Sequence, residues 1–396
     1  MALGEHGGQA IAISGKLVIF GCYDDSELYS RNQVLVEALS EEFSEVILVR
    51  SKSSTGRLPA NNHQRLSGLL AAAKTATSLV GKYMSLFSQR SQLSGADCVF
   101  VPYPAYLDRL FLSFLLPRNW SGLVVVDAFL CLHDTVVKDR KLVRERGLMA
   151  RLVYWLENTT LNRADIVLID TARQQAMLID QYRLDVDKVW AVPVGVNEAL
   201  WVPMELPPLE DHFEVLFYGT FIPLHGVDAI VEAAEILQGI DESVRITLVG
   251  TGQAADSIAQ QLESSDFANI RWARTLVEPQ ELYQYMRASH CVLGVFGASE
   301  KSANVVPYKA YQAMAANHIL ITRAGPAMDD LLSGIESIPG LCLVPAGDPQ
   351  ALANTILDVK RNYDEYRLSS RTRKLYDSRL SNTVIKEKLS RIKELV

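Results

Sequence analysis

Two lysines lie near the expected start of a helix between residues 290 and 325, and their positive charges suit the binding of an anion. An apolar run over 291–296 has the length and composition of a buried parallel strand, and Lys301 follows it in a polar loop. Pro307 stands where a helix should begin, and Lys309 lies in its first turn. A helix N-terminus beside two cations predicts an anion site at the end of the strand. The alternative is an ordinary strand–loop–helix unit with a solvated loop.

Apolar runs alternate with helical patterns along the whole chain, and these elements must position the two lysines. The expected strands are 17–21, 46–49, 97–102, 123–129, 165–170 and 189–194, then 215–218, 245–249, 270–273, 291–296, 318–322 and 341–344. Longer helical patterns include 64–88, 105–116 and 140–161. A proline-containing stretch without periodicity, 194–212, separates the two series. Because parallel strands need crossover connections, we expect an α/β protein with two Rossmann-like, doubly wound parallel sheets facing across a cleft.

Composition and charge narrow the class of protein. The chain has 396 residues, of which 48 % are hydrophobic and 21 % charged, as in an ordinary soluble protein. The net charge of −7 argues against a general nucleic-acid binder. Five cysteines without C-x-x-C spacing favour buried thiols in a reducing cytoplasm. We expect no signal peptide, no membrane-spanning helix, no metal site and no cofactor, since none of the corresponding patterns is found.

Several short segments occur in an order and spacing that are informative together. They are Asp127-Ala128-Phe129 with Asp134-Thr135, the strand 193–197, Phe217-Tyr218-Gly219-Thr220 with His225-Gly226, the strand end 248–252 and the helix 306–315. Together they resemble the GT-B-fold retaining glycosyltransferases of family four, bacterial glycosyl transferases group 1. The resemblance spans nearly the whole chain.

The resemblance implies a nucleotide-sugar donor, UDP- or GDP-linked, held by the carboxyl-terminal domain. The implied donor- and phosphate-binding residues are Gly219, Thr220, His225, Gly250, Lys301, Val306, Lys309 and Gln312. The family usually has glutamate at the positions of Asn304 and Gln312. It tends to have arginine at Thr220 and lysine at His225. Either the two lysines therefore carry the phosphate contacts, or the donor site is altered or inactive.

In the amino-terminal half, the resemblance places a residue that touches the donor sugar at the end of a central strand. Asp127 stands near that place, with His133 and Asp134 just beyond it, and these three are the expected catalytic residues. A buried carboxylate is costly unless it is paired, which favours a role for Asp127. The first strand–helix turn carries Tyr29, Arg31 and Asn32, which are candidates for acceptor or phosphate contact. A helix cap at this turn is the compatible structural alternative.

The domain boundaries follow from the same resemblance. We expect an acceptor-binding domain over 1–203, a nucleotide-sugar-binding domain over 204–375, and a helix over 376–396 that packs back on the first domain. The segment 138–151 carries six basic residues and lies close to an apolar helix. It could contact an anionic membrane and a lipid-linked acceptor, or be a solvated helix. The helices 64–88 and 140–161 could also form a homo-oligomer contact.

The sequence therefore predicts a cytoplasmic, metal-independent, retaining glycosyltransferase that makes a bacterial polysaccharide or secondary glycan. It would act on a glycan or lipid-linked acceptor, in solution or at the inner face of the cell membrane. Two alternatives stay open. One is a nucleotide-sugar epimerase on the same architecture. The other is a non-catalytic relative that binds a nucleotide sugar or a partner protein.

Overall fold

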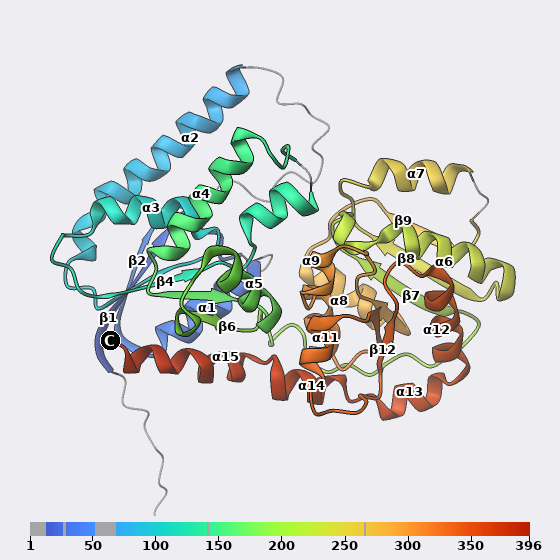
Figure 1. The fold of residues 1–396 in the computed structure, drawn as a ribbon. Helices are drawn as coiled ribbons and strands as arrows, with labels where there is room; N and C mark the ends of the chain where they lie inside the picture. Colours follow the sequence, from blue (N-terminus) through green and yellow to red (C-terminus); the bar gives the residue numbers. More distant parts are fainter. Residues whose placement is uncertain (1–12, 27–28, 52–68, 141, 265–266) are drawn as a thin grey trace, which may run out of the picture.

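Each half of the chain folds around one six-stranded sheet, with helices on both faces (Figure 1). The computed structural model describes residues 13–26, 29–51, 69–140, 142–264 and 267–396. All strand pairs within both sheets are parallel. The expected fold class, two doubly wound parallel sheets, is confirmed.

The first sheet has the order β2-β1-β3-β4-β5-β6. Its strands are β1 (Ile13–Gly21), β2 (Phe43–Arg50), β3 (Cys98–Val101), β4 (Leu123–Asp127), β5 (Ile166–Ile169) and β6 (Val189–Ala191). Alternate strand side chains face opposite layers. One layer contains α2 (Leu69–Ser88), α3 (Ala105–Leu115), α4 (Leu148–Asn162) and α5 (Ala172–Tyr182). The other contains α1 (Ser30–Ser40) and α15 (Asn382–Leu389).

The second sheet has the order β12-β11-β10-β7-β8-β9. Its strands are β7 (Phe213–Tyr218), β8 (Val244–Val249), β9 (Ile270–Ala273), β10 (Cys291–Leu293), β11 (Leu320–Arg323) and β12 (Leu341–Val344). One face carries α6 (Val227–Ile240), α7 (Ala255–Ser264), α12 (Pro349–Arg361) and α13 (Tyr363–Ser369), and the other carries α8 (Pro279–Arg287), α10 (Tyr308–Ala315), α11 (Pro326–Leu331) and α14 (Thr372–Arg379). The strand order reverses between β7 and β10. Sheets of this kind bind ligands at that switch point, beyond the strand carboxyl ends.

The expected long helix over 140–161 is wrong at its beginning. The chain forms a π-helical segment over Asp134–Asp139, residue 140 and residues 142–147 are not helical, and α4 starts at Leu148. Gly147 has extended backbone angles (φ −80°, ψ 164°). Glycine weakens a helix, and Arg144 and Arg146 are exposed, so this stretch has no apolar face to bury. Of the expected helix 64–88, the first five residues lie outside the described residues.

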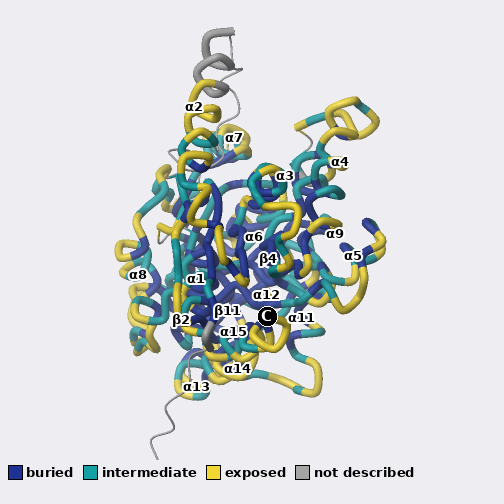
Figure 2. The backbone as a smooth tube through the Cα atoms, turned by 90° about the vertical axis from the view of Figure 1, so that its left-hand side faces the viewer, coloured by how far each residue is buried: buried dark blue, intermediate teal, exposed yellow. Residues whose placement is uncertain are grey.

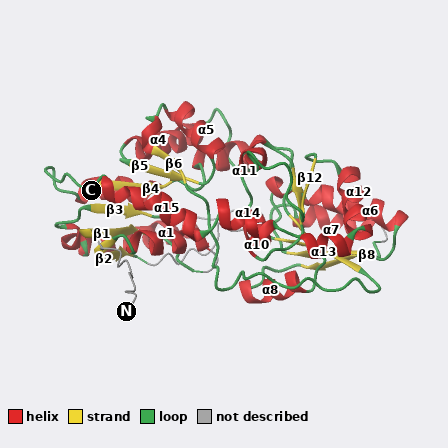
Figure 3. Cartoon of the chain, turned by 90° about the horizontal axis from the view of Figure 1, so that it is seen from below, coloured by secondary structure: helices red, strands yellow, loops and turns green. Residues whose placement is uncertain are grey.

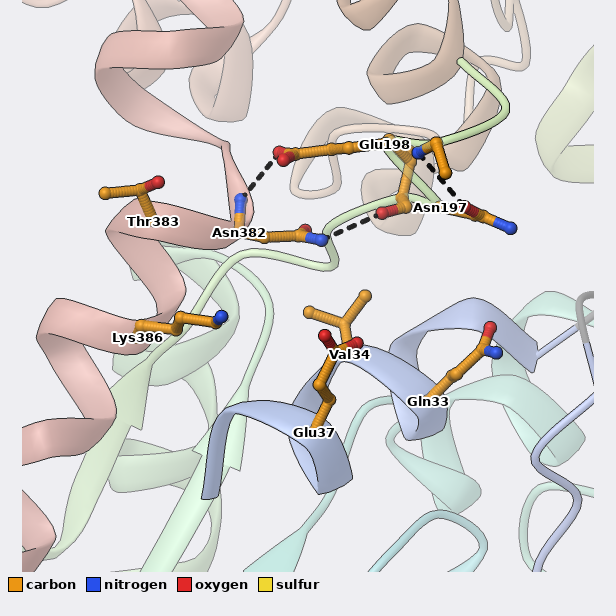
Figure 4. A pocket seen from close by; sticks show the side chains of 10 residues that line it. Gln33, Val34, Glu37, Asn197, Glu198, Asn382, Thr383 and Lys386 are labelled. Atoms are coloured by element: carbon orange, nitrogen blue, oxygen red, sulfur yellow. Dashed lines mark hydrogen bonds between the residues drawn. The ribbon is translucent and has the colours of Figure 1, made fainter. Parts of the chain in front are cut away.

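The chain crosses between the domains twice, after β6 and again between α14 and α15, as the view along the sheets shows (Figure 3). The two crossings are tied together around Glu198, which accepts hydrogen bonds from Asn382 N–H (2.9 Å) and Tyr376 Oη (2.8 Å). Asn382 Nδ2 also donates to the Val196 carbonyl (3.1 Å). A polar pocket of about 300 Å³ lies here between α1 and α15 (Figure 4). These bonds fix the return helix at the junction of the domains.

Among the residues that the structure describes, no helix combines the length and the apolar character that a membrane span requires.

Candidate functional site

The residues that directly follow β7 and β8 must be glycine, because the backbone there leaves no room for side chains. Gly219 and Gly250 have φ angles of +131° and +145°, which side-chain-bearing residues rarely adopt. A Cβ atom at Gly250 would lie only 1.9 Å from the Gly219 carbonyl oxygen. A Cβ atom at Gly219 would instead face His225 Cε1 (3.3 Å) and Lys309 Nζ (3.4 Å). The bare backbone at Gly219 is therefore approached by two side chains that carry nitrogen.

Lys309 is a buried amine without a hydrogen-bond partner. Its Nζ atom lies 4.4 Å from the centre of the Phe217 ring, and the residue is only 5 % exposed. Burial lowers the pKa of Lys309 to about 7, because the surroundings disfavour its charged form. Buried polar groups in proteins are nearly always hydrogen-bonded, so this amine at a strand end is an exception that marks a candidate binding site.

His225 lies beside Lys309, and its imidazole is also buried. Burial, together with the charges of Lys309 and Arg140, holds the pKa of this imidazole well below its usual range. Its Nδ1 atom is buried and has no hydrogen-bond partner. The backbone around it is fixed, because Phe296 N–H donates to the His225 carbonyl at 3.0 Å. The loops after β7 and β10 therefore meet at the switch point and hold the imidazole there.

The remaining residues expected at this domain's site surround the N-terminus of α10. Gln312 is buried and its Oε1 accepts a hydrogen bond from Tyr218 Oη at 2.9 Å. Val306 packs in the core beneath the helix. Thr220 lies next to Gly219, and its backbone forms a hydrogen bond with His225. Sequence spacing placed these residues at one sheet edge, and the structure brings them together there.

The side chain of Lys301 contacts residues of the first domain and not Lys309. It lies in the short helix α9 (Glu300–Ala303), where its Nζ donates to Thr135 Oγ1 and lies 3.9 Å from an Asp134 carboxylate oxygen. Two more bonds cross the domains nearby. Ser30 Oγ donates to Tyr308 Oη (2.6 Å), and Thr171 Oγ1 donates to the Asn304 carbonyl (2.8 Å). The start of α10 and the loop before it therefore face the first domain.

Asp127 is fully buried at the end of β4 and is paired with Arg31. The Arg31 Nε and Nη2 atoms donate to the carboxylate at 2.9–3.1 Å, and Nη1 donates to the carbonyls of Val192 and Pro193 at 2.9 Å. Burial raises the pKa of Asp127, and the guanidinium opposes that rise. The pair links α1, β4 and the start of the interdomain crossing. It supplies the partner that a buried carboxylate needs.

The first strand–helix turn is held by backbone contacts. Asn32 Nδ2 donates to the carbonyls of Asp24 (2.8 Å) and Tyr103 (2.7 Å), which joins the loops after β1 and β3. Tyr29 precedes α1 as its N-cap residue and is partly buried, and its side chain does not cap the helix. Arg31 and Asn32, both expected to contact a ligand, are thus buried in contacts within the protein.

His133 and Asp134 are placed by Glu157, a residue that the sequence reasoning missed. The buried Glu157 carboxylate accepts from the N–H groups of Leu132 (2.7 Å) and His133 (2.8 Å). It also accepts from Tyr106 Oη (3.0 Å) and Tyr182 Oη (2.6 Å). Burial lowers the pKa of His133. Nothing in the sequence around Glu157 indicates its role, because all four donors come from other elements.

The substitution Glu157→Gln should release this loop. The new side chain would present an NH₂ group to donors that need an acceptor, so we expect the free energy of unfolding to fall by roughly 1–3 kcal/mol. Faster hydrogen exchange at the amides of Leu132 and His133 would accompany the loss. The matched control is Glu145, an exposed residue of the connection between β4 and α4. Glu145→Gln should change neither the free energy of unfolding nor the exchange of these amides. Unchanged exchange at both amides in the Glu157 variant would contradict this assignment.

Arg140 is a second residue near the site that the sequence did not identify as functional. The sequence groups it with the basic segment 138–151, whereas the structure places it between the domains. Its charge opposes the burial that raises the pKa of Tyr103 in the first domain, and adds to the burial that lowers the pKa of His225 in the second. Its Nε atom is buried without a hydrogen-bond partner. Arg140 therefore brings a second incompletely paired cation within electrostatic reach of His225.

Within the described residues, no group of three or more His, Cys, Asp or Glu side chains is placed to hold a metal ion.

Comparison with known proteins agrees with this geometry. Residues 212–362 match the family model described as glycosyl transferases group 1. A D-inositol 3-phosphate glycosyltransferase of Stackebrandtia nassauensis is 26 % identical over 159 residues, which is 36 % of this chain. The match covers only 34 % of that relative's length.

Solved structures resemble the whole chain. HepE from Anabaena, in complex with UDP, has a TM-score of 0.65 at 13 % identity, covering 96 % of this chain and 100 % of its own. TarM has a TM-score of 0.55 at 15 % identity, covering 74 % and 54 %. At these identities the likeness shows the fold. This protein therefore has the GT-B fold, and its carboxyl-terminal domain is similar to the group 1 glycosyltransferases over residues 212–362.

Proposed function

We propose that this protein transfers a sugar from a nucleotide-diphosphate sugar to a glycan or lipid-linked acceptor, with retention of anomeric configuration and without a metal ion. The observation that carries the proposal is the buried, unpartnered Lys309 amine beside Gly219 at the switch point. A diphosphate against the bare Gly219 backbone would give this amine its partner. The group 1 family match and the UDP complex of HepE support a UDP-sugar as the donor.

The chemistry of such a transfer gives each nearby cation a task. Breaking the bond to the sugar leaves negative charge on the diphosphate and positive charge on the anomeric carbon. Lys309 and Arg140 would stabilise the leaving phosphates as fixed charges. His225 would line the site beside Lys309, with its ring hydrogen-bonded to the Thr220 backbone. Gln312 would lie near the nucleoside, with its Oε1 already bonded to Tyr218. Together these groups replace the arginine and lysine that the family tends to have at Thr220 and His225.

In the first domain, His133 and Asp134 are the proposed groups nearest the sugar. Asp134 lies within 3.9 Å of Lys301, on the edge that faces the second domain. Asp127 has both oxygens bonded to Arg31 and is 0 % exposed, so we assign it as a positioning residue. The interdomain contacts at Lys301, Tyr308 and Asn304 would hold the domains together around the donor and exclude water that could hydrolyse it.

A panel of UDP-, GDP- and ADP-sugars would test the proposal. We expect release of free nucleotide from one donor class in the presence of an acceptor, and nuclear magnetic resonance should show a product with the anomeric configuration of the donor. Interconversion of the sugar without nucleotide release would identify an epimerase. Binding without turnover would identify a non-catalytic relative, which Asn304 and Gln312 in place of glutamates would favour.

The affinity for a nucleotide sugar should fall as the pH rises above 7. The Lys309 pKa is about 7 in the free protein, and a bound diphosphate would raise it. At pH 8 most of the free protein must then gain a proton on binding, whereas at pH 6 it already carries one. We expect uptake of close to one proton at pH 8 and an affinity about fivefold lower than at pH 7. Calorimetry in buffers of different ionisation enthalpy measures both, and a pH-independent affinity would contradict the proposed contact.

A further inference from the structure

The first domain exposes apolar side chains along three neighbouring helices. More than half of the large apolar residues that the described chain exposes fall between residues 79 and 155. Most of these residues lie on the three helices: Leu79, Val80, Met84 and Phe87 of α2, Leu107 and Phe114 of α3, and Leu148, Met149, Leu152, Tyr154 and Trp155 of α4. We call this set the outer face. Figure 2 shows exposed residues, in yellow, along α2 and near α4.

The outer face is built into the fold. In α2, Val80, Met84 and Phe87 recur every three or four positions, as do Leu148, Leu152 and Trp155 in α4, so each set forms a stripe along its helix. Phe114 and Leu148 are each 82 % exposed and Trp155 is 55 % exposed, which is unusual for side chains of this size. The three helices share one layer over the sheet, and Tyr83 of α2 contacts Phe111 of α3 at 4.8 Å between ring centres. The stripes therefore lie on the outside of a single helical layer.

Basic residues accompany the outer face although the chain is acidic overall. Arg144 and Arg146 are exposed just before α4, and Arg151 is exposed in its first turn. Arg90 stacks its guanidinium on Phe87, with 4.2 Å to the ring centre. Glu145 is the exposed acid among them. A second copy of this chain would bring the same cations opposite one another, which is unfavourable. An apolar surface edged by arginines is instead complementary to a bilayer with anionic headgroups.

We propose that the outer face docks on an anionic lipid bilayer. Leu148, Met149, Leu152 and Trp155 enter the region between headgroups and acyl chains, and the arginines contact lipid phosphates. The docking surface runs directly into the site, because α4 follows the segment that carries Asp134 and Arg140. If the proposed function holds, an acceptor anchored in the same bilayer meets the donor at the end of this segment. The docking itself does not depend on turnover.

Vesicle flotation tests the proposal without an activity assay. The full chain should float with vesicles of phosphatidylcholine containing one third phosphatidylglycerol, and far less with phosphatidylcholine alone. Arg144→Ser, Arg146→Ser and Arg151→Ser together should weaken binding about 100-fold, since each surface arginine contributes on the order of tenfold or less. Leu148→Ser with Leu152→Ser should also abolish flotation. The matched control is Leu368→Ser with Val186→Ser, which removes exposed apolar residues elsewhere and should float like the wild type.

Tryptophan fluorescence gives a second measurement, which reports whether the Trp155 ring enters the bilayer. On anionic vesicles the emission of the wild type should shift to the blue, and Trp155→Phe should abolish the shift because the ring of Trp155 enters the bilayer. Equal flotation of the α4 variants and the wild type would overturn the proposal. So would sedimentation as a dimer that Leu148→Ser with Leu152→Ser makes monomeric, because a second copy would then cover the outer face. A wild-type protein that floats with anionic vesicles but transfers no sugar would overturn the proposed function and leave the docking proposal intact.

Discussion

Lys309→Met should abolish nucleotide-sugar binding while making the free protein more stable. Methionine has a similar length and no charge, so the variant loses the cation facing Gly219 and keeps the packing against Phe217. We expect the affinity for UDP-sugars to fall at least 100-fold, roughly the scale for losing a preorganised charge at a phosphate. Isothermal titration calorimetry measures the affinity, and thermal or urea unfolding measures the stability.

The gain in stability follows from the sign of the pKa shift. The Lys309 pKa is lowered from 10.5 to about 7 on folding, so below pH 7 the folded chain carries a buried charge that the unfolded chain keeps in water. Removing it should raise the free energy of unfolding at pH 7 by up to roughly 4 kcal/mol. As the pH rises from 7 towards 10.5, the unfolded chain also loses its proton, and the gain should shrink.

Lys374→Met is the matched control, because Lys374 is an exposed lysine of the same domain. It should change neither the affinity nor, beyond a few tenths of a kcal/mol, the stability. A Lys309→Met variant that is less stable than the wild type and binds UDP-sugars normally would make Lys309 a structural residue. The switch-point site, and with it the proposed donor, would then be wrong.

Asp127→Asn should destabilise the first domain by about 3 kcal/mol, because an uncompensated buried charge is expensive. The substitution leaves the Arg31 guanidinium buried with only the carbonyls of Val192 and Pro193 as partners. The midpoint of urea unfolding should fall accordingly. Asp127 is paired with Arg31 and the proposed phosphate contact at Lys309 lies in the other domain, so binding of a UDP-sugar at low urea should remain close to that of the wild type.

Asp170→Asn is the control for this change. Asp170 is also buried, at the end of the neighbouring strand β5, and its Oδ1 has no hydrogen-bond partner. Burial raises the Asp170 pKa to about 6, so a neutral amide should be tolerated or slightly stabilising above that pH. If Asp127→Asn were as stable as the wild type and had lost turnover, Asp127 would instead act on the sugar, as the resemblance implies.

Much of the architecture could be predicted from local patterns. Buried strands appear as short apolar runs and the helices between them follow the 3.6-residue period, so the two parallel sheets were expected and found. Gly219, Gly250 and Lys309 were likewise placed at the carboxyl edge of the second sheet, because strand ends gather there whatever the side-chain partners are. The helix start was wrong between residues 140 and 148, where periodicity does not separate a basic helix from a basic loop.

The partners of the charges could not be predicted in this way. Arg31 reaches Asp127 across 96 residues, and Lys301 reaches Thr135 in the other domain across 166. Arg140, which belongs by sequence to a basic surface segment, lies close enough to His225 to contribute to its lowered pKa.

The sequence by itself determined where strands end and which side chains lie at those ends, since both depend on neighbours along the chain. Only the tertiary structure decided which cations are paired and which are left for a ligand, because the partner of a buried charge is set by packing between distant elements. Arg31 and Lys301 are satisfied within the protein, whereas Lys309 is buried without a partner.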